Sequence, residues 1–123
     1  WNAPIDCPDH AYKAVKTAVL IKKRLKELNQ ENAFGHEIKI GIGINSGEAL
    51  VGNMGSDQRF DYSVIGDAVN LASRLEGTSK NYDTTIIIGE ETVKRIDKPK
   101  WAFRLVDKVQ VKGKSEKVSI YTV

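Results

Sequence analysis

The run EIKIGIGIN, residues 37–45, constrains the fold of this chain more than any other stretch. Isoleucine occupies every second position from 38 to 44, so these side chains share one face of an extended strand. Gly41 and Gly43 fall on the opposite face, where the lack of a side chain allows another backbone to approach closely. The run therefore predicts a strand with one apolar face and one face that accepts a tightly packed neighbour.

The same glycines could suggest a dinucleotide-binding loop, but their spacing argues against it. That motif needs a third glycine at position 46, which is Ser46 here. We expect the chain to turn at Ser46–Gly47 and to return as a second strand over Glu48–Met54. The stretch therefore predicts a hairpin between the isoleucine strand and Glu48–Met54, and not a strand that leads into a helix.

A long helix is predicted from Asp6 to about Asn29, with Asp6 as its N-terminal cap and Pro8 in the first turn. Lysines on its other faces are expected to be solvated. The apolar residues that recur at helical spacing and define its buried stripe are Ala11, Ala14, Val15, Ala18, Ile21, Leu25 and Leu28.

Strands and helices alternate irregularly along the rest of the chain, which favours the α+β class. The length of 123 residues fits one domain. The predicted elements are an extended piece at Phe60–Ile65, a helix at Asp67–Gly77 capped by Gly77, a buried strand at 84–89, a short helix at Glu90–Ile96, and a hairpin of strands 103–111 and 117–123.

Composition excludes several classes of protein. The net charge of +3 is only mildly basic, and no single-sign block typical of a nucleic-acid-binding arm occurs. One cysteine, Cys7, excludes an internal disulfide and fits a reducing compartment. No apolar run approaches the ~20 residues of a membrane span, and no signal peptide opens the chain. Because the chain begins at Trp1 within an apolar-looking segment, we expect it to be cut from a longer protein.

Asn70 and Arg74 lie four residues apart on the predicted Asp67–Gly77 helix, away from its apolar stripe. An ordinary surface amide and a surface arginine would explain this spacing. The alternative is a site that grips an anion, because a guanidinium offers a fork of donors to phosphate and an amide can orient a sugar hydroxyl. Both interpretations stay open on the spacing alone.

The predicted hairpin tip at Lys112–Ser115 presents a similar choice. Lys112 could belong to an ordinary polar turn, or it could be a flexible ammonium that reaches terminal phosphates. The carboxylates of Asp57, Asp61 and Asp67 are spread over a loop, a strand and a helix start, and no histidine lies at metal-ligand spacing. The residues therefore predict no metal site within this chain.

The stretch IGINSGEALVGNMGSDQRFDYSVIGDAVNLASRLEG resembles the catalytic domain of class III nucleotidyl cyclases, the adenylate and guanylate cyclases. The opening WNAPIDCPDHAYKAV and the closing FRLVDKVQVKGKSEKVSIYTV resemble the same family, so the likeness extends over nearly all 123 residues. It implies a ferredoxin-like cyclase domain of the α+β class. It also implies that 1–123 is the C-terminal two-thirds of that domain, without its first strand, two helices and the following hairpin.

The resemblance assigns roles to five residues. In the VNLASR motif, Asn70 would orient the ribose and Arg74 would bind the phosphate whose charge reorganises. Lys112 in the VKGK motif would contact the nucleotide phosphates. Ser63 stands where the family places a purine-selecting residue, and Ile65 would line the same purine pocket. Many adenylate cyclases carry aspartate or threonine at this position, and guanylate cyclases often carry cysteine. Serine resembles threonine in hydrogen bonding, so the resemblance favours ATP over GTP.

The reaction that the resemblance implies is the conversion of ATP to 3′,5′-cyclic AMP and pyrophosphate at a composite site in a homodimer. Two Mg²⁺ or Mn²⁺ ions would take part, with ligands on segments absent from this chain, so 1–123 alone is predicted to be inactive. The expected location is cytoplasmic, with membrane attachment only through absent segments. The alternatives are a guanylate cyclase, a catalytically silent module for dimerisation or regulation, and a nucleotide-binding module without turnover.

Overall fold

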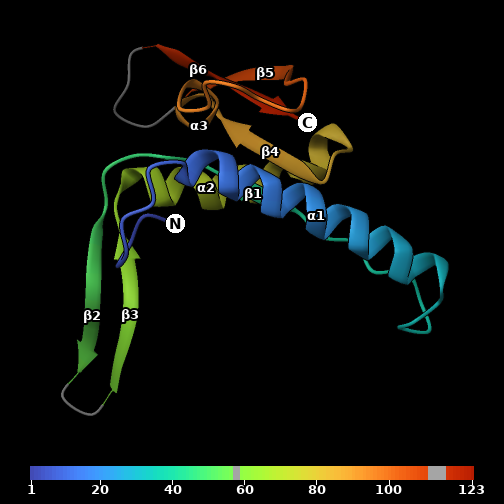
Figure 1. Cartoon of the computed structure of the whole chain (residues 1–123), viewed down its shortest axis with the longest axis horizontal. Coiled ribbons are helices and arrows are strands. Elements are labelled where there is room, and N and C mark those ends of the chain that lie inside the picture. The colour runs from blue at the N-terminus through green and yellow to red at the C-terminus, as the bar shows by residue number, and fades with distance from the viewer. Residues whose placement is uncertain (57–58, 111–115) are drawn as a thin grey trace.

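A computed structural model describes residues 1–56, 59–110 and 116–123 of the chain. The α+β class is confirmed (Figure 1). In chain order the elements are α1 (His10–Gln30), β1 (Ile42–Ile44), β2 (Leu50–Ser56), β3 (Arg59–Ile65), α2 (Asp67–Thr78), the 3₁₀ helix η1 (Ser79–Tyr82), β4 (Ile86–Gly89), α3 (Glu90–Lys94), β5 (Arg104–Gln110) and β6 (Lys117–Thr122).

Four strands form one sheet, in the order β1-β4-β6-β5. We call this sheet, together with the helices that pack on it, the body. β1 runs parallel to β4, with Ile42 opposite Ile86, and β6 is antiparallel to both β4 and β5. The predicted buried strand at 84–89 and the final hairpin are confirmed as β4 and as β5 with β6. The connection between β5 and β6 lies outside the described residues.

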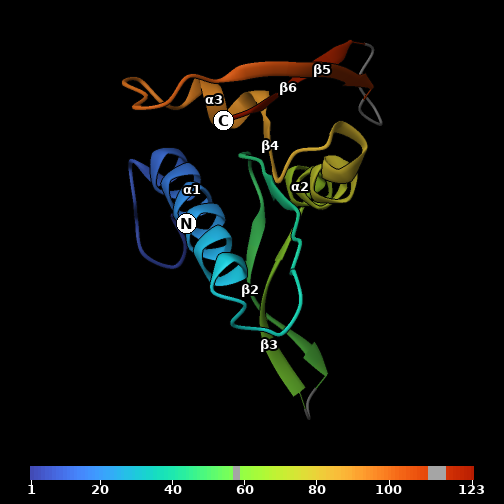
Figure 2. The ribbon, with the colours of Figure 1, turned by 90° about the vertical axis from the view of Figure 1, so that its right-hand side faces the viewer.

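β4 holds the core together because it packs on both faces. Ile86 and Ile88 pack with Ala11, Val15 and Ala18 of α1, whereas Ile87 packs with Leu75 of α2 and Ile120 of β6. The predicted burial of Ile21 in the same stripe is wrong, because this side chain is 44% exposed. Figure 2 shows α1 and α2 on either side of β4. All three isoleucines of β4 are completely buried, as alternation along a strand covered on both faces requires.

α2 packs against the glycine face of β1, which confirms the prediction that another backbone approaches this face closely. A Cβ atom at Gly43 would overlap the carbonyl oxygen of Ala72 and the backbone nitrogen of Glu76. A Cβ atom at Gly41 would overlap the hydroxyl of Ser79. α2 therefore sits closer to β1 than any residue with a side chain at these positions would allow.

The predicted hairpin between the isoleucine strand and Glu48–Met54 is wrong. β2 pairs antiparallel with β3, with Leu50 opposite Ile65, and these two strands form an arm that projects from the body (Figure 1). Gly47 lies against Ala68 of α2, so the chain leaves β1 past the start of that helix and does not turn back along the strand. β1 instead pairs in parallel with β4, whose isoleucines are buried.

The predicted ends of several elements also need correction. α1 begins at His10 and not at Asp6, because Asn2 accepts a hydrogen bond from the Cys7 backbone N–H and holds the preceding residues in a separate turn. The isoleucine strand is regular only over Ile42–Ile44. Gly77 is not a cap, because the chain continues through η1 until Asp83 adopts a left-handed conformation.

Candidate functional site

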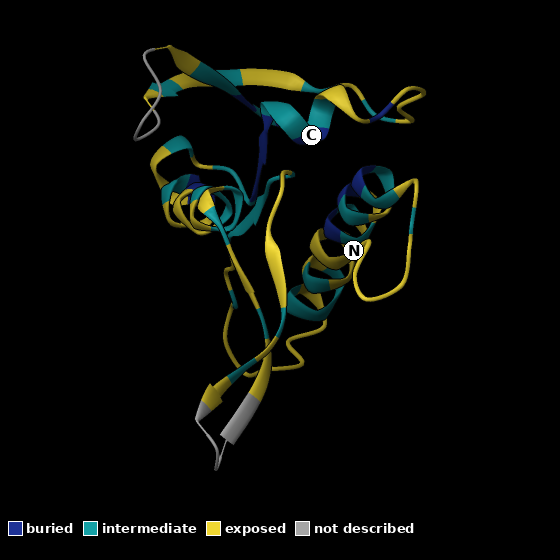
Figure 3. Cartoon of the chain, turned by 90° about the vertical axis from the view of Figure 1, so that its left-hand side faces the viewer, coloured by how far each residue is buried: buried dark blue, intermediate teal, exposed yellow. Residues whose placement is uncertain are grey.

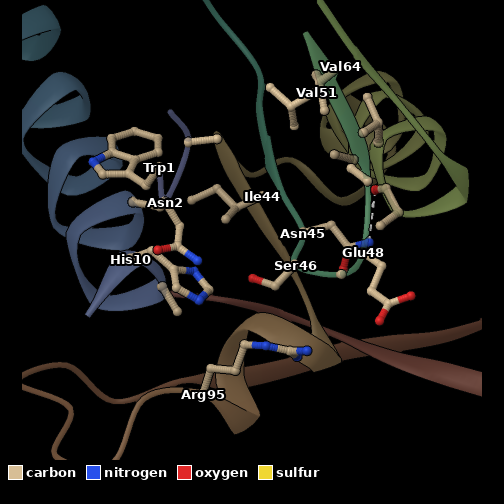
Figure 4. A pocket seen from close by; sticks show the side chains of 18 of the residues that line it. Trp1, Asn2, His10, Ile44, Asn45, Ser46, Glu48, Val51, Val64 and Arg95 are labelled. Carbon is tan, nitrogen blue, oxygen red and sulfur yellow. Dashed lines mark hydrogen bonds between the residues drawn. The ribbon is translucent and has the colours of Figure 1, made fainter. Parts of the chain in front are cut away.

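A cavity of about 700 Å³ opens between the start of α1, the base of the arm and the start of α2 (Figure 4). Ile44 and the segment after it form the floor, and the first residues of the chain close one side. α2 presents only small or apolar side chains to this space: Ala68, Val69 and Ala72.

Ser63, the predicted purine-selecting residue, lines this cavity from β3. Its hydroxyl donates a hydrogen bond of 3.1 Å to the carbonyl of Asp61 on the same strand, and its side chain is half-buried. Ile65, two residues further on, does not line the cavity and is 57% exposed. The structure therefore brings Ser63 to a cavity and leaves Ile65 on the surface of the arm.

The cavity is also lined by polar side chains to which the sequence assigned no role in a site: His10, Ser46, Glu48 and Arg95. They come from α1, from the segment after β1 and from the residue that ends α3, so no local motif could have grouped them. Arg95 donates to the carboxylate and the carbonyl of Glu91 at 2.8 Å and 2.7 Å, and this bond lowers the pKa of Glu91.

Asn70 and Arg74 both lie on an exposed side of α2, one turn apart, as predicted. The Arg74 Nη1 donates a hydrogen bond of 3.1 Å to the backbone carbonyl of Gln110. Gln110 is the last residue of β5, and Lys112 follows it by two residues but lies outside the described part of the chain. Arg74 thus links the helix to the strand that leads into the VKGK motif.

A second side-chain contact joins the same parts of the fold. The Tyr82 hydroxyl, at the end of η1, donates a 2.8 Å hydrogen bond to Asp107 of β5. This bond, together with the backbone N–H of Lys108, lowers the pKa of Asp107, and it raises the pKa of Tyr82. Two side-chain hydrogen bonds, from Arg74 and from Tyr82, therefore link the α2–η1 segment to β5.

Two groups of predicted site residues are thus kept apart. Ser63 opens into the cavity beside Ala68 and Ala72, whereas Asn70 and Arg74 do not line that cavity. Positions 68 and 72 lie on nearly the opposite side of a helix from positions 70 and 74, because each residue advances the helix by ~100°. Within one chain, α2 therefore separates Ser63 from the amide and the guanidinium.

Comparison with known proteins identifies the family of this chain. The profile of the adenylate and guanylate cyclase catalytic domain matches residues 2–123. The chain belongs to this cyclase family. It is 41% identical to an adenylate cyclase of Anabaena cylindrica over 96% of its length, and 37% identical to adenylate cyclase 1 of Rhizobium meliloti over its whole length. It spans only 24% and 19% of those two proteins.

A solved cyclase structure has the same fold. It is the catalytic core of a rhodopsin-guanylyl cyclase with converted specificity, in complex with ATPalphaS. The TM-score is 0.81 at 36% sequence identity, and the match covers 98% of this chain and 62% of the other. The cyclase fold expected from the resemblance is confirmed.

The described residues of this cyclase-family chain do not provide a metal centre. Among them, no group of three or more histidine, cysteine, aspartate or glutamate side chains lies close enough to hold an ion. The described helices also include none that is long and apolar enough to cross a bilayer.

Proposed function

We propose that this chain supplies the ribose- and phosphate-contacting half of a nucleotidyl cyclase site, and that ATP is its nucleotide. The observation that carries the proposal is the pairing of Asn70 and Arg74 on an exposed side of α2, in a chain of the cyclase family. Arg74 also contacts the end of β5, from which Lys112 follows in the sequence. Donors for sugar and phosphate therefore come from neighbouring elements.

In the proposed reaction, the ribose 3′-oxygen attacks the α-phosphorus of ATP and gives up its proton to solvent. The new O–P bond closes the 3′,5′-cyclic ring as the bond to the bridging oxygen breaks and pyrophosphate leaves. Asn70 orients the ribose by hydrogen bonding, and the Arg74 guanidinium offsets charge that develops on the phosphate oxygens. Arg74 suits this role because it is charged at every relevant pH and forms paired hydrogen bonds.

The choice of ATP over GTP rests on Ser63 and on the relatives. A serine hydroxyl can both donate and accept, as the adenine edge requires, and Ser63 lines a cavity at the base of the arm. The Anabaena and Rhizobium relatives are adenylate cyclases by name. A guanylate cyclase is the alternative, and competition between ATP and GTP for turnover distinguishes the two.

Cyclases of this class use divalent metal ions, and we propose two Mg²⁺ or Mn²⁺ ions for the active enzyme. The described residues of this chain do not fit such ions, so their ligands would come from other parts of the assembled enzyme. We therefore assign this chain no step that acts through a metal.

A homodimer is the proposed setting for this half-site. The exposed side of α2 that carries Asn70 and Arg74 faces away from the cavity that Ser63 lines. A nucleotide site on this side of α2 therefore needs a second protein surface to complete it. A second copy of the same protein would offer that surface. A cytoplasmic location, where ATP is abundant, follows from the proposal.

The test is Arg74→Ala in the active cyclase that contains this chain. We expect kcat to fall ~100-fold, equivalent to about 3 kcal/mol, with a smaller change in KM, because Arg74 acts mainly in the transition state. Lys112→Ala is expected chiefly to raise KM for ATP. Arg24→Ala is the matched control, because Arg24 is an exposed arginine on α1 that pairs only with Glu27 among the described residues.

If Arg74→Ala lowers kcat by less than about threefold, Arg74 is an ordinary surface arginine without a role in the reaction. An unchanged KM for Lys112→Ala would contradict the phosphate contact. Full-length wild-type protein that binds ATP in calorimetry without forming cyclic AMP would support a binding module instead. Protein that does neither would support a silent dimerisation or regulatory module.

A further inference from the structure

The side chain of Asn45, just beyond β1, forms a wedge between two other elements (Figure 4). Its Nδ2 donates a 3.0 Å hydrogen bond to the carbonyl of Ala68, the second residue of α2. Its Oδ1 is buried against Gly89, the last residue of β4, where a Cβ atom would overlap that oxygen. The amide is therefore held between the end of β4 and the beginning of α2.

Asn45 occupies the same face of the strand as Gly41 and Gly43. Those glycines allow α2 to approach, but they offer it no hydrogen bond through a side chain. The amide of Asn45 adds a directional contact at the N-terminal end of the helix. The glycines thus set the distance between β1 and α2, and Asn45 fixes where the first turn of α2 lies.

That first turn leads directly to the proposed catalytic pair. Asn70 and Arg74 follow Ala68 by two and six residues on one continuous helix, so a shift of the first turn moves both side chains. Ser63 lies on β3 and Lys112 follows β5, so neither is carried by α2. Displacement of α2 therefore affects the amide and the guanidinium selectively.

We propose that Asn45 is a positioning residue that aims Asn70 and Arg74 at the reacting phosphate and ribose. This inference rests on the proposed cyclase function. Asn45 itself does not touch the nucleotide in this proposal. It acts through the Ala68 carbonyl and is kept in place by the absence of a side chain at Gly89.

The buried Oδ1 provides the sharpest evidence for a constrained role. Among the described residues, it is a buried side-chain oxygen with no hydrogen-bond partner, which is costly for a group of this kind. A smaller apolar residue would avoid that cost but would lose the bond to Ala68. The amide at position 45 is therefore explained by what its Nδ2 does for α2.

The experiment compares three variants of the active cyclase that contains this chain. Asn45→Ala removes the bond to Ala68. Gly89→Ala leaves Asn45 in the sequence but pushes its amide aside, because the new Cβ would overlap the end of a movable side chain. Asn29→Ala is the matched control, because the Asn29 amide makes two bonds to the Ile38 backbone, at 2.8 Å and 2.9 Å. These residues line a second groove that borders the end of α2 and not its start.

We expect Asn45→Ala and Gly89→Ala each to lower kcat by roughly tenfold to a hundredfold, because small misplacements of a positioned group have effects of this size. KM for ATP should change by less than about twofold in both variants, because the α2 side chains that are displaced act chiefly in the transition state. Hydrogen–deuterium exchange should rise in peptides covering 67–74. Asn29→Ala should lower the melting temperature without these changes.

The inference is overturned if Arg74→Ala lowers kcat strongly while Asn45→Ala and Gly89→Ala do not. It is also overturned if Asn29→Ala lowers kcat as much as they do, because general loss of stability would then explain all three. If Asn45→Ala does not fold, the kcat, KM and exchange of Gly89→Ala decide the outcome. An Arg74→Ala variant with unchanged kcat would instead refute the proposed function itself.

Discussion

The body and the arm of this molecule differ in how far their apolar side chains are buried. In the body, β4 is buried on both faces between α1 and α2, and its three isoleucines are inaccessible to solvent. In the arm, β2 and β3 carry exposed apolar residues on both faces, including Leu50 at 67% exposure (Figure 3). The same kind of residue therefore stabilises one region and remains uncovered in the other.

This difference shows which region the chain can stabilise alone. A two-stranded ribbon is marginally stable in water unless its apolar face packs on something else. The body meets that condition with its own helices, whereas the arm extends beyond them. We infer that the arm depends on a second surface. Most of the predictions below compare a change in the body with a matched change in the arm.

Truncation of a core side chain should have the largest effect. Ile87→Ala leaves a cavity between β4 and α2 and should lower the free energy of unfolding by about 2–5 kcal/mol. Leu50→Ala in the arm should change it by no more than about 0.5 kcal/mol. Chemical denaturation followed by circular dichroism measures both, and equal losses would contradict the contrast between body and arm.

Addition of one methyl group to a glycine should have the next largest effect. Gly43→Ala would push α2 away from β1, because the new Cβ meets helix backbone that cannot move alone, and should cost about 1–3 kcal/mol. Gly52→Ala is the matched change in the arm, where the new Cβ meets no atom within 4 Å beyond its two chain neighbours. A denaturation midpoint for Gly43→Ala as high as that of Gly52→Ala would disprove the tight seat of α2.

Self-association should depend on the arm and on the edge of the sheet. β1 is the outermost strand of the sheet in the described part of the chain, and an exposed apolar strand is a template for pairing with another chain. We expect 1–123 alone to self-associate in light scattering across a concentration series. A compact monomer of 13.7 kDa at every concentration would contradict this expectation.

Lysine substitutions on both faces of the arm test the contribution of β2 and β3 to that association. Leu50→Lys combined with Val64→Lys should reduce the average mass, because buried charges would oppose any surface that covers the arm. Leu105→Lys is the control, because Leu105 is similarly exposed but lies on β5 of the body. An equal reduction by Leu105→Lys would assign the association to surface hydrophobicity in general.

The smallest effect concerns pH. The Tyr82 hydrogen bond lowers the pKa of Asp107, so the stability that this carboxylate contributes is present above its ordinary value of 3.8 and is lost as pH falls through the lower folded value. The same bond raises the pKa of Tyr82, so its contribution is present below 10.0 and is lost as pH rises through the higher folded value.

Tyr82→Phe should therefore lower the melting temperature slightly at neutral pH. The difference in melting temperature between this variant and wild type should become smaller at both low and high pH. Tyr62→Phe is the matched change on the exposed arm and should leave the melting curve unchanged. A difference for Tyr82→Phe that is the same at every pH would show that the hydroxyl acts only through packing.

The sequence by itself determined the local elements and their faces. Alternation of isoleucine with glycine identified the apolar and close-packing faces of β1, and helical spacing placed Asn70 and Arg74 together on α2. Both follow from fixed periods of 2.0 and 3.6 residues, which depend on the backbone alone. The family resemblance likewise rested on contiguous motifs and was confirmed by the match over residues 2–123.

Only the tertiary structure decided which elements meet. β1 pairs with β4, more than 40 residues away in the sequence, and not with the neighbouring β2, because a strand covered by α1 and α2 needs a partner that is apolar on both faces. The Arg74–Gln110 and Asn45–Ala68 bonds join segments that no periodicity relates. Contacts of this kind depend on how faces fit in three dimensions, which a local pattern does not encode.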